Sequence, residues 1–193
     1  MKRRDTYTEL VLAGTDIISR QGFNATGIDA VLKAASVPKG SFYHYFKSKE
    51  EFGMAIIDAY AEQLEQRLQT FLDAPETEPL DRIRNFLENA FARIERTHCT
   101  KGCLLGNLGQ ELADVNERFR SRLEEVFVFW KDRFADCLKE AQIKNQLSGD
   151  MDPVQMAGFI LASWEGAILR SKVMKSTQPM TDFIDVAFAS ILR

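Results

Sequence analysis

Hydrophobic residues recur at helical spacing along almost the whole chain of 193 residues. Apolar positions at i, i+3, i+4 and i+7 predict amphipathic helices that bury one face. The predicted helices cover residues 6–20 and 27–35, a short segment within 37–49, and then 48–72, 80–97, 104–113, 119–141, 154–172 and 182–192. The pattern therefore predicts an all-α protein of about nine helices.

Two short predicted helices near the N-terminus are joined by the turn at residues 36–37. The first carries an apolar stripe of Ile28, Val31, Leu32 and Ala35, and the second carries Phe42, Tyr45 and Phe46 at i, i+3 and i+4. Two such helices form a helix-turn-helix, in which the second helix enters the major groove of DNA. Donor side chains lie mostly off its apolar stripe, at Lys39, Ser41, Tyr43, His44 and Lys47. The pattern favours DNA binding; the alternative is a helical hairpin with a purely structural role.

The stretch from Gly22 to Glu50 resembles the signature of the TetR family of transcriptional regulators. The resemblance is carried by Gly22-Phe23, by Thr26 and by the continuous run from Ala35 to Glu50. It implies an N-terminal three-helix DNA-binding domain, residues 1–50, and a helical effector-binding and dimerisation domain, residues 51–193. Most members of this family are repressors, and at position 27 the chain has Gly where many of them have Ser or Thr.

The resemblance also implies partners and contact residues. The partners are a near-palindromic double-stranded DNA operator, a second copy of the chain and a small-molecule effector, without a cofactor. Carried over position by position, the implied DNA contacts are Thr26, Gly27, Lys39, Gly40, Ser41, Tyr43, His44, Lys47 and Lys49. Among these, Thr26 and Lys49 are expected on phosphates, and the major-groove contacts are expected at Lys39, Gly40, Ser41, Tyr43 and His44.

The charge distribution supports a DNA-binding N-terminus in a chain whose net charge is −3. Residues 1–50 carry eight Lys or Arg against five Asp or Glu, so the remainder of the chain is acidic. Lys2, Arg3 and Arg4 form a basic arm that either contacts DNA or is a solvated tail. No apolar run reaches the roughly 20 residues of a membrane span, and the basic N-terminus, without a following apolar run, is not expected to be a signal peptide. An odd number of cysteines, three, predicts reduced thiols and a cytoplasmic protein.

Neither catalysis nor metal binding is indicated. The chain has two histidines and lacks the motifs of phosphate-binding loops or of metalloproteases. His98, Cys99 and Cys103 have the ligand chemistry of a zinc site, but Gly102 interrupts the segment and no fourth ligand is evident. The alternative function is an all-helical enzyme or adaptor that carries a helix-turn-helix-like hairpin.

A thiol is the predicted trigger for release from DNA. Gly102-Cys103-Leu104 and Trp164-x-Gly166-Ala167 resemble a subgroup of the family that controls N-ethylmaleimide reductase, which implies that Cys103 senses electrophiles or oxidants. Cys103 precedes a predicted helix, whose N-terminus stabilises a thiolate, and the cation of Lys172 could approach it. The alternative is that Cys103 packs beside a pocket for a conventional ligand, lined by Phe86, Phe127, Trp130 and Trp164.

The last two predicted helices are apolar on nearly all sides. Helices without a polar face need cover on every side, so a partner subunit is the simplest explanation. The predicted dimer interface contains Phe159, Ile168, Phe183 and Phe188, beside Trp164.

Overall fold

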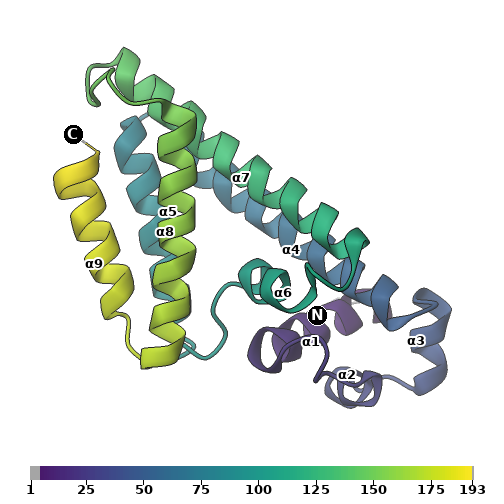
Figure 1. The fold of residues 1–193 in the computed structure, drawn as a ribbon. Coiled ribbons are helices and arrows are strands. Elements are labelled where there is room, and N and C mark those ends of the chain that lie inside the picture. Colours follow the sequence, from purple (N-terminus) through teal and green to yellow (C-terminus); the bar gives the residue numbers. More distant parts are fainter. Residues whose placement is uncertain (1–4, 193) are drawn as a thin grey trace. The chain divides into compact units, whose positions relative to one another are not determined.

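The computed structural model describes residues 5–192. Within them the chain is all-α, as predicted, with nine α-helices, a short π-helical turn and no strand (Figure 1). The α-helices are α1 (Thr6–Gln21), α2 (Ile28–Ala35), α3 (Lys39–Tyr45), α4 (Lys49–Leu72), α5 (Pro79–Glu95), α6 (Leu104–Leu112), α7 (Glu117–Ile143), α8 (Pro153–Met174) and α9 (Gln178–Val186). No helix within this part of the chain is long and apolar enough to cross a membrane.

Capping side chains explain where several helices begin and end. The carboxylate of Asp5 accepts a hydrogen bond from a backbone N–H in the first turn of α1 at 2.8 Å. Gly22 ends the same helix at φ +89°, in the left-handed region that favours glycine. At the start of α4, the hydroxyl of Ser48 accepts from the backbone N–H of Glu51, and the carboxylate of Glu51 accepts from the backbone N–H of Lys47. Asp152 caps α8. These helix ends at Gly22, Ser48 and Asp152 are therefore set by residues within or next to the helices themselves.

The chain folds into two compact units. One contains residues up to 62 together with residues 104–123, and the other contains residues 63–103 together with 124 onward. The chain passes from one unit to the other within α4, within α7 and at the peptide bond after Cys103. The contacts therefore group α6 and the first turns of α7 with the N-terminal helices. The predicted domain boundary at residue 50 does not include this grouping.

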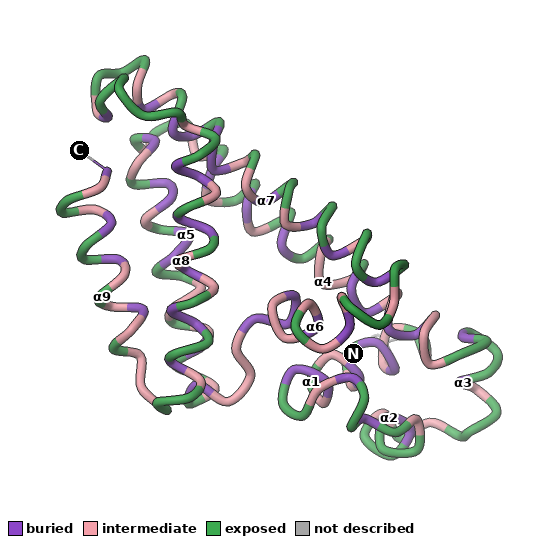
Figure 2. Tube along the Cα trace, in the orientation of Figure 1, coloured by how far each residue is buried: buried purple, intermediate pink, exposed green. Residues whose placement is uncertain are grey.

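The core of the first unit is an aromatic cluster. The ring of Phe42 lies 5.3 Å from that of Phe46 and 5.2 Å from that of Phe52, and all three residues are buried. Gly14 of α1 faces this cluster, where a Cβ atom would collide with Phe52 and Ile56 of α4. Glycine at this position allows the two helix backbones to approach closely. Figure 2 shows the buried positions recurring along these helices.

In the second unit, aromatic rings and one ion pair join the helices. Phe86 of α5 packs edge-to-face on Trp130 of α7, with ring centroids 5.7 Å apart. Arg82, also on α5, is 7% exposed and donates to Glu140 of α7 at 2.8 Å. Its guanidinium also donates to the carbonyl of Thr77, so this buried charge is well satisfied.

The last helix differs from the prediction. We expected it over 182–192, but α9 begins at Gln178 and is followed by a π-helical turn over Ala187–Ile191. Pro179 lies in the first turn, where its missing N–H costs no hydrogen bond and its φ angle suits a helix. Met180 is fully buried, so the apolar face of α9 starts earlier than the periodicity indicated.

Candidate nucleic-acid interface and thiol site

Helices α2 and α3 form the predicted helix-turn-helix. Val31 and Leu32 bury one face of α2, which ends at Ser36 in a left-handed conformation with φ +56°. Phe42 anchors α3 with no exposed surface. Tyr45, expected in the same buried stripe, is instead 42% exposed, and its ring lies edge-on to that of Tyr7 of α1. The last turn of α3 is therefore held at the surface of the unit.

The outward face of α3 presents most of the predicted DNA contacts. Lys39, Gly40, Tyr43 and His44 are exposed, as is Lys47 just beyond the helix, whereas Ser41 is half-buried. A Cβ atom placed at Gly40, or at Gly27 before α2, would meet nothing within 4 Å. Both glycines therefore leave the backbone open to close approach by a ligand.

One ion pair occupies this face. The ammonium of Lys39 lies 3.2 Å from the carboxylate of Asp29, and both side chains are well exposed. Exposed pairs contribute little, roughly 0–1 kcal/mol, so Lys39 can exchange this partner for a DNA contact at small cost.

The side chain of Thr26, for which a phosphate contact was predicted, is engaged within the chain. Thr26 is 1% exposed, and its hydroxyl donates to the carbonyl of Gly22 at 2.6 Å. The amide of Gln21 donates to the same hydroxyl. Thr26 thus closes the turn between α1 and α2, and its hydroxyl is unavailable to a phosphate.

Lys49 also braces this turn. Its ammonium donates to the carbonyl of Asn24 at 3.2 Å and lies 4.6 Å from the centre of the Phe23 ring. Burial lowers the pKa of Lys49, and the negative charge of Glu111 opposes that shift. A phosphate contact by Lys49 stays a prediction, as does a contact by the arm Lys2–Arg4, which lies outside the described residues.

Glu111 of α6 holds the same turn from the other side. Its two carboxylate oxygens accept from the backbone N–H groups of Phe23 at 2.7 Å and Asn24 at 2.6 Å. Gly22 makes room for this carboxylate, because a Cβ atom there would lie 2.9 Å from one oxygen. We refer to this arrangement of Glu111, Lys49 and residues 22–24 as the α1–α2 clamp. Sequence reasoning missed it, because nothing in a glycine-rich helix signals a bond to backbone amides 87 residues away.

Cys103 lies directly before α6 and is buried. Its side chain is hydrogen-bonded to Glu165 of α8, and burial raises the pKa of that carboxyl to about 7 while the bond to Cys103 opposes the shift. The ammonium of Lys172 donates to the carbonyl of Lys101 at 3.4 Å. The structure thus places the predicted cation beside the segment that carries Cys103. Burial and repulsion from Lys175 lower the pKa of Lys172.

The other two cysteines are also buried, unbridged thiols. Burial raises the pKa of Cys137 to about 11, which keeps this thiol protonated and unreactive at neutral pH. His98 is exposed and adopts φ +50°, next to the buried Cys99. Within residues 5–192 the structure contains no group of three or more His, Cys, Asp or Glu residues that could hold a metal ion.

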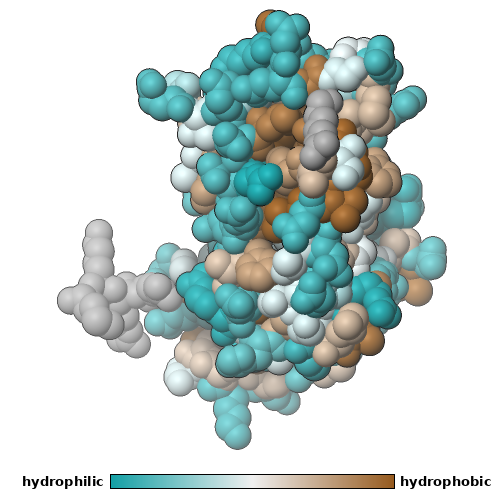
Figure 3. Space-filling model, turned by 90° about the vertical axis from the view of Figure 1, so that its left-hand side faces the viewer, coloured by the Kyte–Doolittle hydropathy of each residue, from teal (hydrophilic) through white to brown (hydrophobic). Residues whose placement is uncertain are grey.

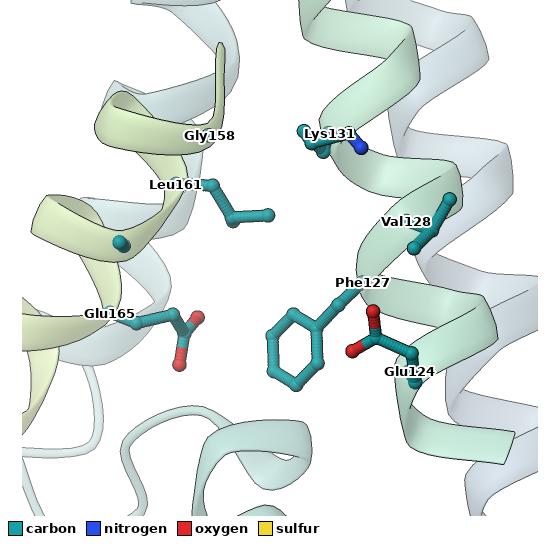
Figure 4. A pocket seen from close by; sticks show the side chains of 8 residues that line it. Glu124, Phe127, Val128, Lys131, Gly158, Leu161 and Glu165 are labelled. Atoms are coloured by element: carbon teal, nitrogen blue, oxygen red, sulfur yellow. The ribbon is translucent and has the colours of Figure 1, made fainter. Parts of the chain in front are cut away.

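A groove of about 270 Å³ lies between α7 and α8. Among the four aromatic residues predicted for a pocket, Phe127 lines it (Figure 4). Phe86 and Trp130 pack on each other in the core, and Trp164 packs on Phe183 with ring centroids 5.6 Å apart. These three aromatic side chains therefore act in packing, and the sequence pattern could not separate them from Phe127.

The four residues predicted for a dimer interface differ in exposure. Phe159 is 53% exposed, whereas Ile168 is buried within the chain. Phe183 is half-buried, and Phe188 lies beneath the guanidinium of Arg84, 4.4 Å from its centre. Within the described chain, Phe159 is the member of this set that is most available to a partner.

An anchored helix-turn-helix with a donor-rich outer face defines a DNA-binding regulator. Residues 10–54 match the sequence profile of the bacterial regulatory proteins of the tetR family. Residues 79–187 match the tetracyclin repressor-like C-terminal domain. The chain therefore belongs to the TetR family of bacterial transcriptional regulators, as its sequence signature indicated.

Individual relatives cover nearly the whole chain. The transcriptional regulator AcuR of Cereibacter sphaeroides is 42% identical over 92% of this chain and 81% of its own length. The repressor DhaR of Mycobacterium sp. strain GP1 is 33% identical over 100% of this chain and 95% of its own. The crystal structure of the reduced form of Escherichia coli NemR is 30% identical, covers 98% of both chains and superposes with a TM-score of 0.86.

Proposed function

We propose that this protein is a homodimeric repressor that binds a near-palindromic operator and leaves it when a small molecule or an electrophile acts at Cys103. The observation that carries the proposal is the outward face of α3, where Lys39, Tyr43 and His44 are exposed on a helix anchored by Phe42. Lys and backbone groups would position the protein on phosphates, while Tyr43 and Lys39 would read base edges.

Exposed hydrophobic residues support dimerisation through α8 and α9. Figure 3, which faces α9, shows hydrophobic side chains gathered on this surface. The exposed hydrophobic residues of the two helices are Val154, Phe159, Leu169, Val173, Met174 and Val186. A groove of about 490 Å³ beside Phe159 is lined in part by Met151, Met156 and Ile191. In a two-fold dimer, the two α3 helices would lie about 34–36 Å apart, one turn of DNA.

The position of Cys103 in the chain supports a thiol trigger. Cys103 ends the first of the two segments that form its unit, and it is joined directly to Leu104, which opens α6. Because α6 carries Glu111 of the α1–α2 clamp, an adduct at Cys103 would act through one peptide bond on the helix that holds the turn before α2. The relative NemR is a transcriptional repressor whose crystal structure is that of a reduced form. A distinct reduced form is consistent with a response of NemR to oxidation.

The DNA contacts can be tested on an operator selected from random DNA. We expect Tyr43→Ala to weaken operator binding about tenfold, because a lost base contact costs roughly 1–3 kcal/mol. Lys39→Ala should weaken operator binding by a similar factor, because it also removes a base contact. The measurement is fluorescence anisotropy at several salt concentrations, and Lys139→Ala, an exposed lysine of α7, is the control. Unchanged affinity in both α3 variants would place the DNA-reading face elsewhere.

The trigger can be tested on the protein–operator complex. N-ethylmaleimide should release wild-type protein from DNA, while Cys103→Ser should stay bound, because serine forms no thioether. Cys137→Ser is the matched control and should behave as wild type, since burial keeps that thiol protonated. Equal release of all three proteins would exclude Cys103 as the trigger and indicate that N-ethylmaleimide acts at another group, such as Cys99.

A further inference from the structure

The groove between α7 and α8 is built from two facing stripes. Gly158, Leu161, Ala162 and Glu165 recur at i, i+3, i+4 and i+7 on α8, and Glu124, Phe127, Val128 and Lys131 do the same on α7. In Figure 4, Leu161 and Glu165 point into the groove from α8, and Phe127 points into it from α7. Glu165 therefore belongs to the wall of the groove and is also hydrogen-bonded to Cys103. One side chain connects this space to the buried thiol.

The carboxyl group of Glu165 is unusual for an exposed groove. Its Oε1 atom is buried and has no hydrogen-bond partner within the described chain. Carboxylates in such surroundings are costly, which raises the pKa of Glu165 to about 7. At neutral pH the group thus exists in both forms, as a base that can take a proton and as an acid that can return it.

Other charged groups surround this pair. Glu124 and Lys131 line the same groove from α7, and Lys172 donates to the carbonyl of Lys101, two residues before Cys103. Burial raises the pKa of Glu165, and the hydrogen bond to Cys103 opposes this shift. Proton exchange within the pair is therefore governed mainly by the thiol and the carboxylate themselves.

We propose that Glu165 is the proton acceptor of the Cys103 thiol and that the groove admits uncharged α,β-unsaturated carbonyl compounds to this pair. The inference rests on the proposed role of Cys103 as a trigger. As the sulfur forms a bond to the β-carbon, its proton moves to the carboxylate of Glu165, and the π electrons move to the carbonyl oxygen as an enolate. The proton then returns from Glu165 to the α-carbon. The net change is addition of S–H across C=C, and no oxidant is needed.

The lining of the groove indicates why an uncharged compound is favoured. Phe127, Val128 and Leu161 supply apolar walls, and the opposite charges of Glu124 and Lys131 leave the groove without a strong preference for ions of either sign. The volume of about 270 Å³ suits a small molecule rather than a polymer. N-Ethylmaleimide, which carries two carbonyls conjugated to one double bond and no charge, is a suitable probe.

The test is the pH dependence of alkylation at Cys103. Full-length wild type, Glu165→Gln and Glu88→Gln, an exposed glutamate of α5, are treated with N-ethylmaleimide between pH 5.5 and 9. Mass spectrometry of the Cys103 peptide gives each rate. The wild-type rate should rise with a midpoint near pH 7, where Glu165 loses its proton, and then level off. Glu88→Gln should follow wild type.

Glu165→Gln should lose this rise and react about tenfold more slowly at pH 7.5. General base catalysis contributes roughly 10²–10⁴-fold, but part of the thiol ionises without help, so the expected loss is smaller. Glutamine mimics the protonated carboxyl in size and charge, a form that wild type already populates near pH 7, so this variant is expected to fold. Glu165→Asp, which keeps the charge, should retain a rise near neutral pH.

Two other outcomes separate this inference from the proposed function. If Glu165→Gln is alkylated as fast as wild type, or faster, Glu165 is not the proton acceptor; a faster reaction means that its charge merely suppresses the thiolate. If Cys103 of wild type is not alkylated at any pH, the proposed trigger fails, and the inference about Glu165 fails with it.

Discussion

Phe42→Ala should lower the free energy of unfolding by about 3–5 kcal/mol and abolish operator binding, the largest effect expected of any substitution in α3. Phe42 has no exposed surface, and its ring contacts those of Phe46 and Phe52 at 5.3 and 5.2 Å. Removing the ring leaves a cavity that this rigid aromatic cluster cannot close. Because α3 has seven residues, it has little helical stability of its own and depends on this anchor.

Denaturant unfolding followed by circular dichroism gives the stability, and anisotropy gives the affinity. Tyr43→Ala, a neighbouring but exposed aromatic residue, is the control and should change stability by less than about 1 kcal/mol. If Phe42→Ala were as stable as this control, the aromatic cluster would not be what holds α3.

Glu111→Ala should destabilise the N-terminal unit by about 2–3 kcal/mol and weaken operator binding. Hydrogen bonds to a charged group contribute roughly 1.5–3 kcal/mol, and this carboxylate accepts two of them, from the backbone of Phe23 and Asn24. The N–H of Phe23 is partly buried, so it would be left without full solvation. The loss also removes the negative charge that opposes the lowered pKa of Lys49.

Hydrogen exchange provides the local measurement for this variant. The amides of residues 22–26 should exchange faster in Glu111→Ala than in wild type, whereas Asp114→Ala, an exposed acid that follows α6, should leave them unchanged. Glu111→Gln, which keeps one carbonyl oxygen, should give an intermediate rate. Protection in Glu111→Ala equal to that in wild type would mean that the turn is held without the clamp.

The sequence predicted the helices well where local chemistry sets their limits. Gly22, Ser48 and Asp152 fix helix ends through their own conformation or side-chain bonds, so they can be read without knowing the fold. The start of α9 was placed too late because Met180 is buried by tertiary packing in a turn that carries few other apolar residues. The hydrophobic periodicity of the sequence alone could not predict that Met180 is buried.

The functional residues also divide into those that local sequence predicts and those that depend on tertiary contacts. The outer face of α3 followed from one helical stripe, but the hydroxyl of Thr26 and the ring of Tyr45 depend on which neighbours they meet. Glu111 and Glu165 were not predicted as site residues. The helical periodicity around each of them does not distinguish it from other polar residues. Each acquires its role from a segment more than 60 residues away.

The α1–α2 clamp also has a consequence for how this protein's relatives can diverge. Glu111 binds backbone amides, which every residue except proline provides, so substitutions of Asn24 require no matching change at position 111. Correlated substitution, by which spatial neighbours are commonly detected in related sequences, would leave this pair unseen. The residue that the clamp constrains is instead Gly22. Its positive φ and a carboxylate oxygen 2.9 Å from any added Cβ together exclude a side chain at this position.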